Sequence, residues 1–177
     1  MTCGIIYNME HKLEMELHIP RWDQLPDMGL YMEQVVSLVN STFGPACADI
    51  SYPPLTPNMV NNYVKAKIVE APVNKKYGKL SVAQIIVVYI LKMCYSTEEA
   101  GRLIEIGMEI GRPNIVYNRF CKAIEDAMQN VFGGEIYLSD EALPDRRYRY
   151  LMGNFALSFA CKFYVHKVFL QGQRHSE

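Results

Sequence analysis

Apolar residues recur at helical spacing over most of the chain, and turn-forming residues separate these stretches. Strands are expected only around Val69 and Tyr77, in a loop or short hairpin punctuated by Pro72 and Gly78. The sequence therefore predicts a mainly α fold, with helices over residues 28–42, 57–68, 81–94, 96–108, 113–133 and 146–170.

Capping residues mark where several of these helices begin. Thr56 is placed to cap the second helix, and Pro57 takes its first position, where a missing N–H costs nothing. The proline-containing stretch "FGPACADISYPP" is expected to end the first helix before this point. The third and fourth helices are each expected to start with a capping box, formed by Ser81 with Gln84 and by Ser96 with Glu99.

The short helix that begins at Pro57 has an unusual polar face, because three of its residues are asparagines. Asparagine is a poor helix former, and a face that meets only water could use Glu, Lys or Gln at lower cost. Asparagine pairs bidentately with adenine in the major groove, and lysine contacts phosphates or guanine. We therefore expect this face to contact DNA through Asn58, Asn61, Asn62 and Lys65, which share one side of the helix.

Charge is unevenly distributed, although the chain as a whole has a net charge of −1. Residues 56–79 contain five lysines against one acid, Glu70, so this stretch is a basic island in an acidic protein. Its lysines are expected to neutralise backbone phosphates, with Tyr77 packing or touching the sugar-phosphate. Together with the helix face, the expected DNA contacts therefore include Lys67, Lys75, Lys76, Tyr77 and Lys79.

A plain solvated surface is the alternative for this helix. Polar residues opposite apolar ones occur on any surface helix, and Asn58 could serve to cap the first turn. If the protein is instead a helical sensing or interaction module that binds no DNA, Lys75, Lys76 and Lys79 would pair with acids or be covered by a partner.

The order of these segments resembles that of MerR-type bacterial regulators. In those proteins a capped recognition helix leads into a basic wing with an aromatic residue and then into two further helices. Here "TPNMVNNYVKAKIVEAP" resembles the first part, "VNKKYGKLS" the wing and "VAQIIVVYILKMCYSTEEAGRLIEI" the helix pair. More closely, residues 20–106 are similar to a bacterial family of unknown function that is regarded as MerR-like. The resemblance implies a winged helix-turn-helix.

The sequence departs from the MerR pattern at two points. MerR proteins usually carry an arginine before the aromatic residue of the recognition helix, where this chain has Asn61 and Asn62 before Tyr63. About a dozen residues are expected between the first two helices, where those proteins have a short turn. No effector site is carried over from that family.

The C-terminal segment carries two further patterns. Its cations and aromatics alternate over residues 146–150, which is typical of nucleic-acid contacts, but nearby acids (Asp140, Glu141 and Asp145) offer compensation as the simpler explanation. Residues 151–170 are strongly apolar, yet a polar residue recurs every four positions, which argues against a membrane span and favours a helix inside a bundle or dimer. That stripe consists of Asn154, Ser158, Lys162 and His166.

Motifs of known enzyme classes are missing from the sequence, so no catalytic residue, metal ligand or cofactor is expected. Carboxylates such as Glu125 and Asp126 are expected on solvated helix faces. The five cysteines are dispersed, which indicates reduced thiols and a cytoplasmic protein, and no signal peptide is recognised.

The sequence thus predicts a mainly α protein with a MerR-like winged helix-turn-helix and a C-terminal helical bundle. The expected division is an N-terminal arm (residues 1–19), a winged region (20–110) and a C-terminal region for dimerisation or sensing (111–172). The expected function is sequence-specific binding of double-stranded DNA by a homodimer that regulates transcription. A helical interaction or ligand-sensing module without DNA binding is the alternative.

Overall fold

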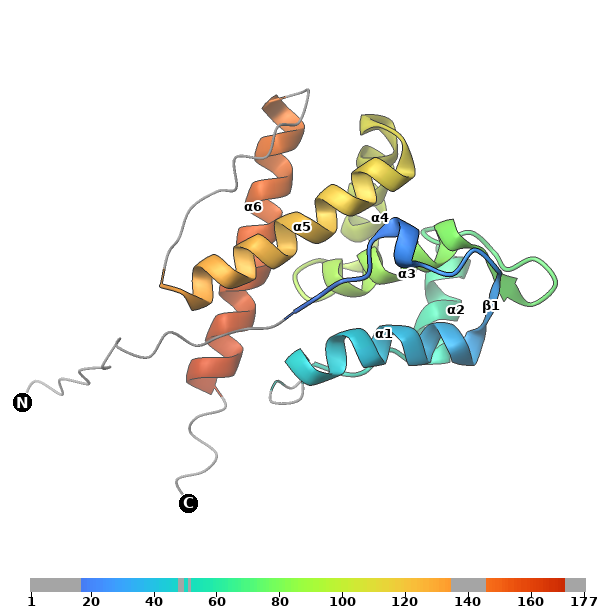
Figure 1. Ribbon diagram of the computed structural model, residues 1–177, viewed down its shortest axis with the longest axis horizontal. Coiled ribbons are helices and arrows are strands. Elements are labelled where there is room, and N and C mark those ends of the chain that lie inside the picture. The colour runs from blue at the N-terminus through green and yellow to red at the C-terminus, as the bar shows by residue number, and fades with distance from the viewer. Residues whose placement is uncertain (1–16, 48–49, 51, 135–145, 171–177) are drawn as a thin grey trace, which may run out of the picture.

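The computed structural model (Figure 1) describes residues 17–47, 50, 52–134 and 146–170 of the chain. This part of the chain is mainly helical, with six α-helices and one two-stranded sheet, which confirms the predicted class. In chain order the elements are a 3₁₀ turn (Trp22–Gln24), β1 (Leu30–Tyr31), α1 (Met32–Cys47), α2 (Pro57–Lys65), β2 (Lys76–Tyr77), α3 (Lys79–Leu91), α4 (Thr97–Ile110), α5 (Pro113–Phe132), α6 (Arg146–Tyr164) and a π-helical turn (Val165–Leu170).

Local sequence signals correctly placed the starts of three helices, two of which have side-chain caps. The Thr56 hydroxyl accepts a hydrogen bond from the Met59 N–H at 3.3 Å, and α2 begins at the following proline. Ser96 and Glu99 form the predicted capping box of α4 through reciprocal bonds of 2.7 and 3.2 Å. α5 begins at Pro113, as expected, and ends at Phe132, one residue before the predicted end.

The first helix does not have the predicted limits. It begins four residues late, because Leu30 and Tyr31 instead pair with Tyr77 and Lys76 as an antiparallel strand. It also continues through Pro45 to Cys47, since Phe43 and Ala46 are buried against the core. Pro45 lies in the last turn, where few hydrogen bonds remain to be lost.

The expected capping box at Ser81 is wrong. α3 begins two residues earlier, because β2 runs directly into the helix through Gly78. Ser81 therefore lies inside α3 and is buried, at 3% exposure. Gln84 has a different role, since its Oε1 accepts a hydrogen bond from the Glu70 N–H at 3.0 Å.

The predicted hairpin is present as a tight turn over residues 73–76, but the strand that follows it, β2, pairs with β1 and not with a strand at Val69. Val69 is buried outside any strand, whereas Tyr77 belongs to β2, which pairs with β1. Val73 and Lys76 exchange backbone hydrogen bonds of 2.9 and 3.0 Å across a two-residue turn. Both turn residues have positive φ, 50° at Asn74 and 64° at Lys75, as a type I′ turn requires.

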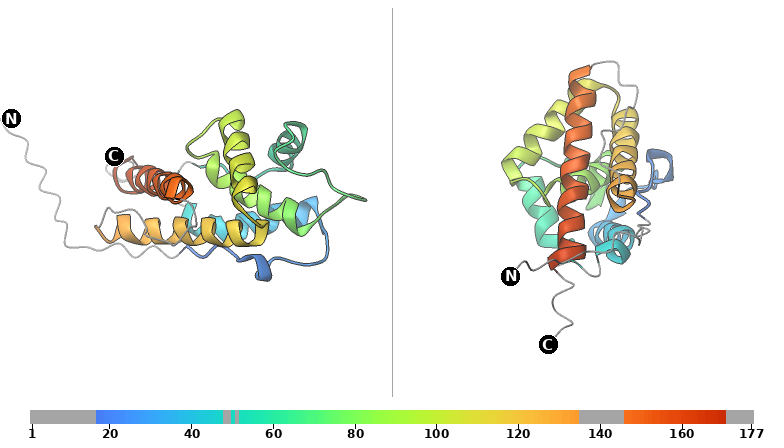
Figure 2. Two further views of the ribbon diagram at one scale, coloured as in Figure 1. Left: turned by 90° about the horizontal axis from the view of Figure 1, so that it is seen from above. Right: turned by 90° about the vertical axis from the view of Figure 1, so that its left-hand side faces the viewer.

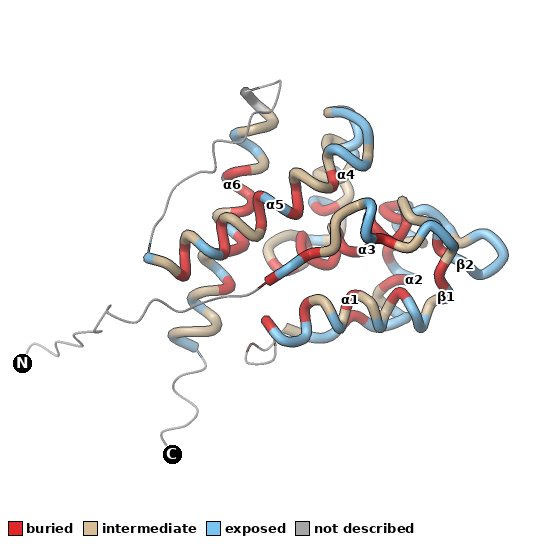
Figure 3. The backbone as a smooth tube through the Cα atoms, viewed as in Figure 1, coloured by how far each residue is buried: buried red, intermediate tan, exposed pale blue. Residues whose placement is uncertain are grey.

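The helices pack around one apolar core (Figures 1 and 2). α6 crosses α5, and α3 lies beneath them, buried on almost every side. In the burial view the inward faces of α3 and α5 are buried, whereas the hairpin end of the molecule is exposed (Figure 3). In the ribbon views, α2 and the hairpin lie together at the end of the molecule farthest from α6 (Figures 1 and 2).

α6 has the polar stripe expected from its sequence. The Asn154 amide donates to the Tyr150 carbonyl and the Ser158 hydroxyl to the Asn154 carbonyl, both at 2.7 Å, while the Lys162 ammonium donates to the Met93 carbonyl. These polar groups thus bond to backbone carbonyls of the protein. Within the described residues, none of the helices has both the length and the apolar character needed to cross a membrane.

Candidate nucleic-acid interface

α2 is anchored by its apolar face. Val60 is fully buried and Tyr63 is 3% exposed, while Met59 and Val64 are half-buried against the core. The apolar side chains thus fix the rotation of the helix about its own axis. Because the helix is amphipathic, its other side is held toward solvent.

The polar face of α2 is open. Asn58, Asn61, Asn62 and Lys65 are all exposed. Within the described residues, none of these four side chains makes a hydrogen bond or ion pair with another residue. The predicted set of amides and one ammonium is therefore presented together on one helix and is not used in holding the fold.

The end of α2 directs the chain toward the hairpin. Lys67 takes a left-handed conformation, with φ of 59°, and the Ile68 N–H turns back to the Tyr63 carbonyl at 3.0 Å. This arrangement satisfies carbonyls at the helix end and leaves the Lys67 side chain exposed. Lys67 therefore adds a second exposed cation close to Lys65.

The hairpin tip carries two more exposed cations. Lys75 occupies the type I′ turn, and Lys76 lies at the start of β2 with its ammonium 5.0 Å from the centre of the Tyr31 ring. A cation over an aromatic face keeps its charge while its position is restricted. The tip thus presents charge on a backbone that two hydrogen bonds hold in shape.

Two of the predicted contacts lie elsewhere. Tyr77 is 3% exposed and packs in the core, so it cannot touch a sugar-phosphate, and burial raises the pKa of its hydroxyl. The Lys79 side chain is half-buried, and its ammonium pairs with the Asp27 carboxylate at 2.5 Å. The strand register accounts for both positions: it turns Tyr77 inward and brings Asp27, ahead of β1, next to the start of α3.

The basic and aromatic residues at the start of α6 are only partly described. Tyr148 is half-buried and Tyr150 is 66% exposed. The side chains of Arg146 and Arg147, and the acids Asp140, Glu141 and Asp145, lie outside the described residues.

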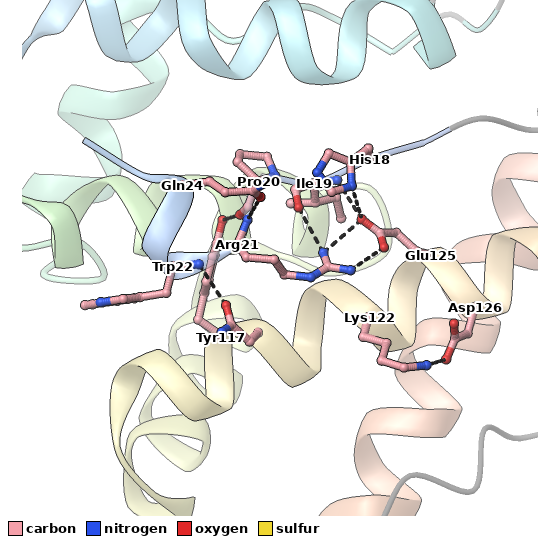
Figure 4. Close-up of polar contacts among 11 residues, drawn as sticks. His18, Ile19, Pro20, Arg21, Trp22, Gln24, Tyr117, Lys122, Glu125 and Asp126 are labelled. Atoms are coloured by element: carbon pink, nitrogen blue, oxygen red, sulfur yellow. Dashed lines mark hydrogen bonds and ion pairs between the residues drawn. The ribbon is translucent and has the colours of Figure 1, made fainter. Parts of the chain in front are cut away.

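A second polar cluster, which the sequence interpretation missed, joins residues 18–24, here called the N-terminal segment, to α5 (Figure 4). Glu125 was expected on a solvated face, but its side chain is only 13% exposed. It accepts hydrogen bonds from the Ile19 N–H at 2.7 Å and from both terminal nitrogens of the Arg21 guanidinium. The hydrogen bond from Arg21 to this carboxylate raises the guanidinium pKa further.

Neighbouring groups complete this junction. The Tyr117 hydroxyl donates to the Pro20 carbonyl at 2.8 Å, and the Asn118 side chain accepts from the Trp22 N–H at 2.8 Å. One sequence signal was available: Glu125 follows Tyr117 and Cys121 at four-residue spacing on the inward face of α5. These groups hold the chain in place and do not form a cleft with reactive groups.

The cysteines do not form a reactive centre in the described residues. Cys47, Cys94, Cys121 and Cys161 are free thiols. Burial raises the pKa of Cys47 to about 11 and that of Cys121 to about 12, so both stay protonated at neutral pH. Within the same residues, His, Cys, Asp and Glu side chains do not gather into a group that could hold a metal ion.

The structure defines a helical protein with an exposed amide-bearing helix beside a lysine-tipped hairpin. The chain belongs to a protein family described as a domain of unknown function (DUF1836), whose model matches residues 20–120, more than half of the chain. No curated protein and no solved structure is significantly similar to the chain. The matched residues contain α1 to α4, the hairpin and the first turns of α5.

Proposed function

We propose that this protein binds double-stranded DNA in a sequence-specific manner and regulates transcription. The observation that carries the proposal is the polar face of α2, whose three asparagine side chains are exposed and unengaged by the described residues. Keeping three asparagines in a nine-residue helix costs helix stability that Ala, Lys or Gln would not cost. Amide contacts to adenine offer a function that offsets this cost.

The arrangement around α2 supports a winged helix-turn-helix of the MerR type. In this proposal α1 is the supporting helix, α2 enters the major groove and the turn at Asn74–Lys75 is the tip of the wing. Residues 48–56 connect the two helices, which is longer than the usual turn of such motifs. The lysines at positions 65, 67, 75 and 76 supply sequence-independent affinity, whereas the asparagines supply sequence preference.

A homodimer is the form in which we propose that the protein binds its operator. Two-fold symmetric proteins read two half-sites and gain affinity from both. The π-helical turn that follows α6 offers apolar surface for such an interface, since Val165 is 45% exposed and Leu170 is 54% exposed. Sedimentation of the Val165→Glu and Leu170→Glu variants tests this part of the proposal separately, because both should be monomeric.

Selection of duplexes from a random pool, repeated at two salt concentrations, tests the function. We expect an enriched motif with palindromic halves, and an affinity that falls steeply with salt. Retention of no duplex at low ionic strength would reject DNA binding. Enrichment without any motif would leave only the electrostatic part of the proposal.

One observation favours the alternative, a helical interaction module that binds no DNA. Lys79 pairs with Asp27, as that alternative requires of the hairpin lysines. Lys75 has no such partner among the described residues, however. The alternative also gives no reason for three exposed asparagines on one helix face. DNA binding therefore accounts for more of the exposed groups.

A further inference from the structure

Away from the α2 surface, the helices line an apolar pocket of about 100 Å³. Its floor consists of buried side chains from α3, α5 and α6, and α4 forms one wall. The floor residues are Ala83, Leu91, Tyr117, Phe120 and Phe155. Because Trp22 and the first half of α6 also line it, the pocket is built from the family-matched region together with the helix beyond it.

The lining carries no charged side chain, and the polar groups of two lining residues are already in use. Gln84 accepts from the Glu70 N–H through its Oε1, and Tyr117 donates its hydroxyl to the Pro20 carbonyl. A charged ligand would lose its hydration there without gaining a partner of opposite charge. The chemistry of the walls therefore favours a neutral, apolar molecule.

Size sets the second limit on the ligand. A cavity of about 150 Å³ lined by apolar side chains stays dry and binds benzene. The present pocket is somewhat smaller but open on one side, where Met108 and Leu151 remain partly exposed. It can thus take a ring or a short alkyl group while the rest of the molecule projects outward.

We propose that this pocket, between α3, α4, α5 and α6, is a binding site for a small, uncharged, apolar ligand such as a monocyclic aromatic compound. The ligand is held by shape and by transfer of its apolar surface out of water. This site is separate from the α2 surface, so the proposal stands whether or not the protein binds DNA.

Fluorobenzene, followed by ¹⁹F NMR on the full-length protein without DNA, tests the site. We expect saturable binding of one molecule per chain, and a rise in Tm of about 3–6 °C at ten times the Kd. The charged analogue 4-fluorobenzoate should bind at least tenfold more weakly. The chain has one tryptophan, and it lines the pocket, so its emission should change with the same Kd.

Two substitutions at Gly107 form a matched pair that locates the ligand. A Cβ at this position meets only Val116 at 3.8 Å, so Gly107→Ala is accommodated and should bind fluorobenzene as the unmodified protein does. Gly107→Leu places a larger side chain at the pocket wall and should abolish binding. Val87→Phe, on the opposite helix, is a second blocking variant should Gly107→Leu fail to fold.

Absence of saturable binding up to the solubility limit would overturn the proposal, as would unchanged binding in both blocking variants. Equal affinity for 4-fluorobenzoate would also overturn it, because the walls would then not select an uncharged ligand. If fluorobenzene does not bind and the blocking variants instead alter the oligomeric state, the pocket is a contact between two copies of the chain.

Discussion

Two polar regions of this protein differ in where their side chains find partners. Around Glu125, every polar group is aimed at another part of the chain, so the cluster joins the N-terminal segment to α5 (Figure 4). On α2, the amides of Asn58, Asn61 and Asn62 are aimed at no described residue. Polar groups that stabilise the fold can therefore be distinguished from polar groups left open for a ligand, because only the former have hydrogen-bond partners among the described residues. Substitutions should distinguish the two kinds as well.

The largest effect is expected from Glu125→Ala. Removing this carboxylate leaves the Ile19 N–H and the Arg21 guanidinium without their acceptor at a partly buried site. We expect the free energy of unfolding to fall by about 2–4 kcal/mol in urea denaturation. Duplex affinity of the folded fraction should not change, because the junction is remote from α2.

The adjacent acid provides the control for this substitution. Asp126 forms an i,i+4 ion pair with Lys122 at 2.5 Å on a more exposed surface. Asp126→Ala should therefore cost only about 0.3–0.5 kcal/mol. Equal destabilisation by the two variants would mean that the Glu125 cluster does not hold the N-terminal segment.

Asn61→Ala should have the opposite effect to Glu125→Ala: the protein should keep its stability and lose duplex discrimination. Alanine is the better helix former, so the free energy of unfolding should rise by about 0.5 kcal/mol. Discrimination between the selected duplex and one altered at the contacted base pair should fall by about 1–3 kcal/mol. Competition binding measures the second effect.

The matched control lies on α6. Asn154 is also exposed on a helix, but its amide donates to the Tyr150 carbonyl. Asn154→Ala should leave duplex discrimination unchanged. A loss of discrimination in Asn154→Ala as large as in Asn61→Ala would contradict the assignment of the interface to α2.

Lys75→Ala combined with Lys76→Ala should weaken binding to all duplexes by about tenfold at moderate salt, and should reduce the salt slope by about two. Stability should change little, because both side chains are exposed. The control is the pair Arg102→Ala and Lys122→Ala, which removes the same charge from α4 and α5. If this control weakens binding equally, net charge and not the hairpin is responsible.

The smallest effect is expected at Asp27. This carboxylate is 95% exposed and pairs with Lys79 beside the hairpin, so Asp27→Ala frees a cation and removes an opposing charge. Duplex affinity should rise about two- to threefold in a fluorescence anisotropy titration. Asp23→Ala, in the nearby 3₁₀ turn, is the control, and an equal gain there would indicate a general charge effect.

Local sequence signals predicted much of the helical structure. Thr56 with Pro57 and Ser96 with Glu99 act within one turn, so their hydrogen bonds follow from spacing alone. β1 could not be found in this way, since Leu30 pairs with Tyr77 far along the chain. The misplaced start of α3 has the same origin, because a strand fixed by that pairing leads into the helix.

The same distinction applies to the sites. The polar face of α2 could be predicted because it depends only on helical spacing within nine residues. The Lys79–Asp27 pair and the Glu125 cluster could not, because tertiary packing brings their members together. In the Glu125 cluster, Ile19 and Glu125 are 106 positions apart in the sequence. The proposed division near residue 110 stays a prediction, and the buried residues on both sides of it form one core cluster.

The side-chain amide signals of the asparagines provide the most direct test of the interface. In a ¹⁵N NMR titration with the selected duplex, the NH₂ signals of Asn58, Asn61 and Asn62 should shift. The Asn40 amide should not, because it donates to the Leu55 carbonyl and accepts from the Leu55 N–H. Shifts confined to other regions, or unmoved α2 amides at saturating duplex, would contradict the proposal that this face enters DNA.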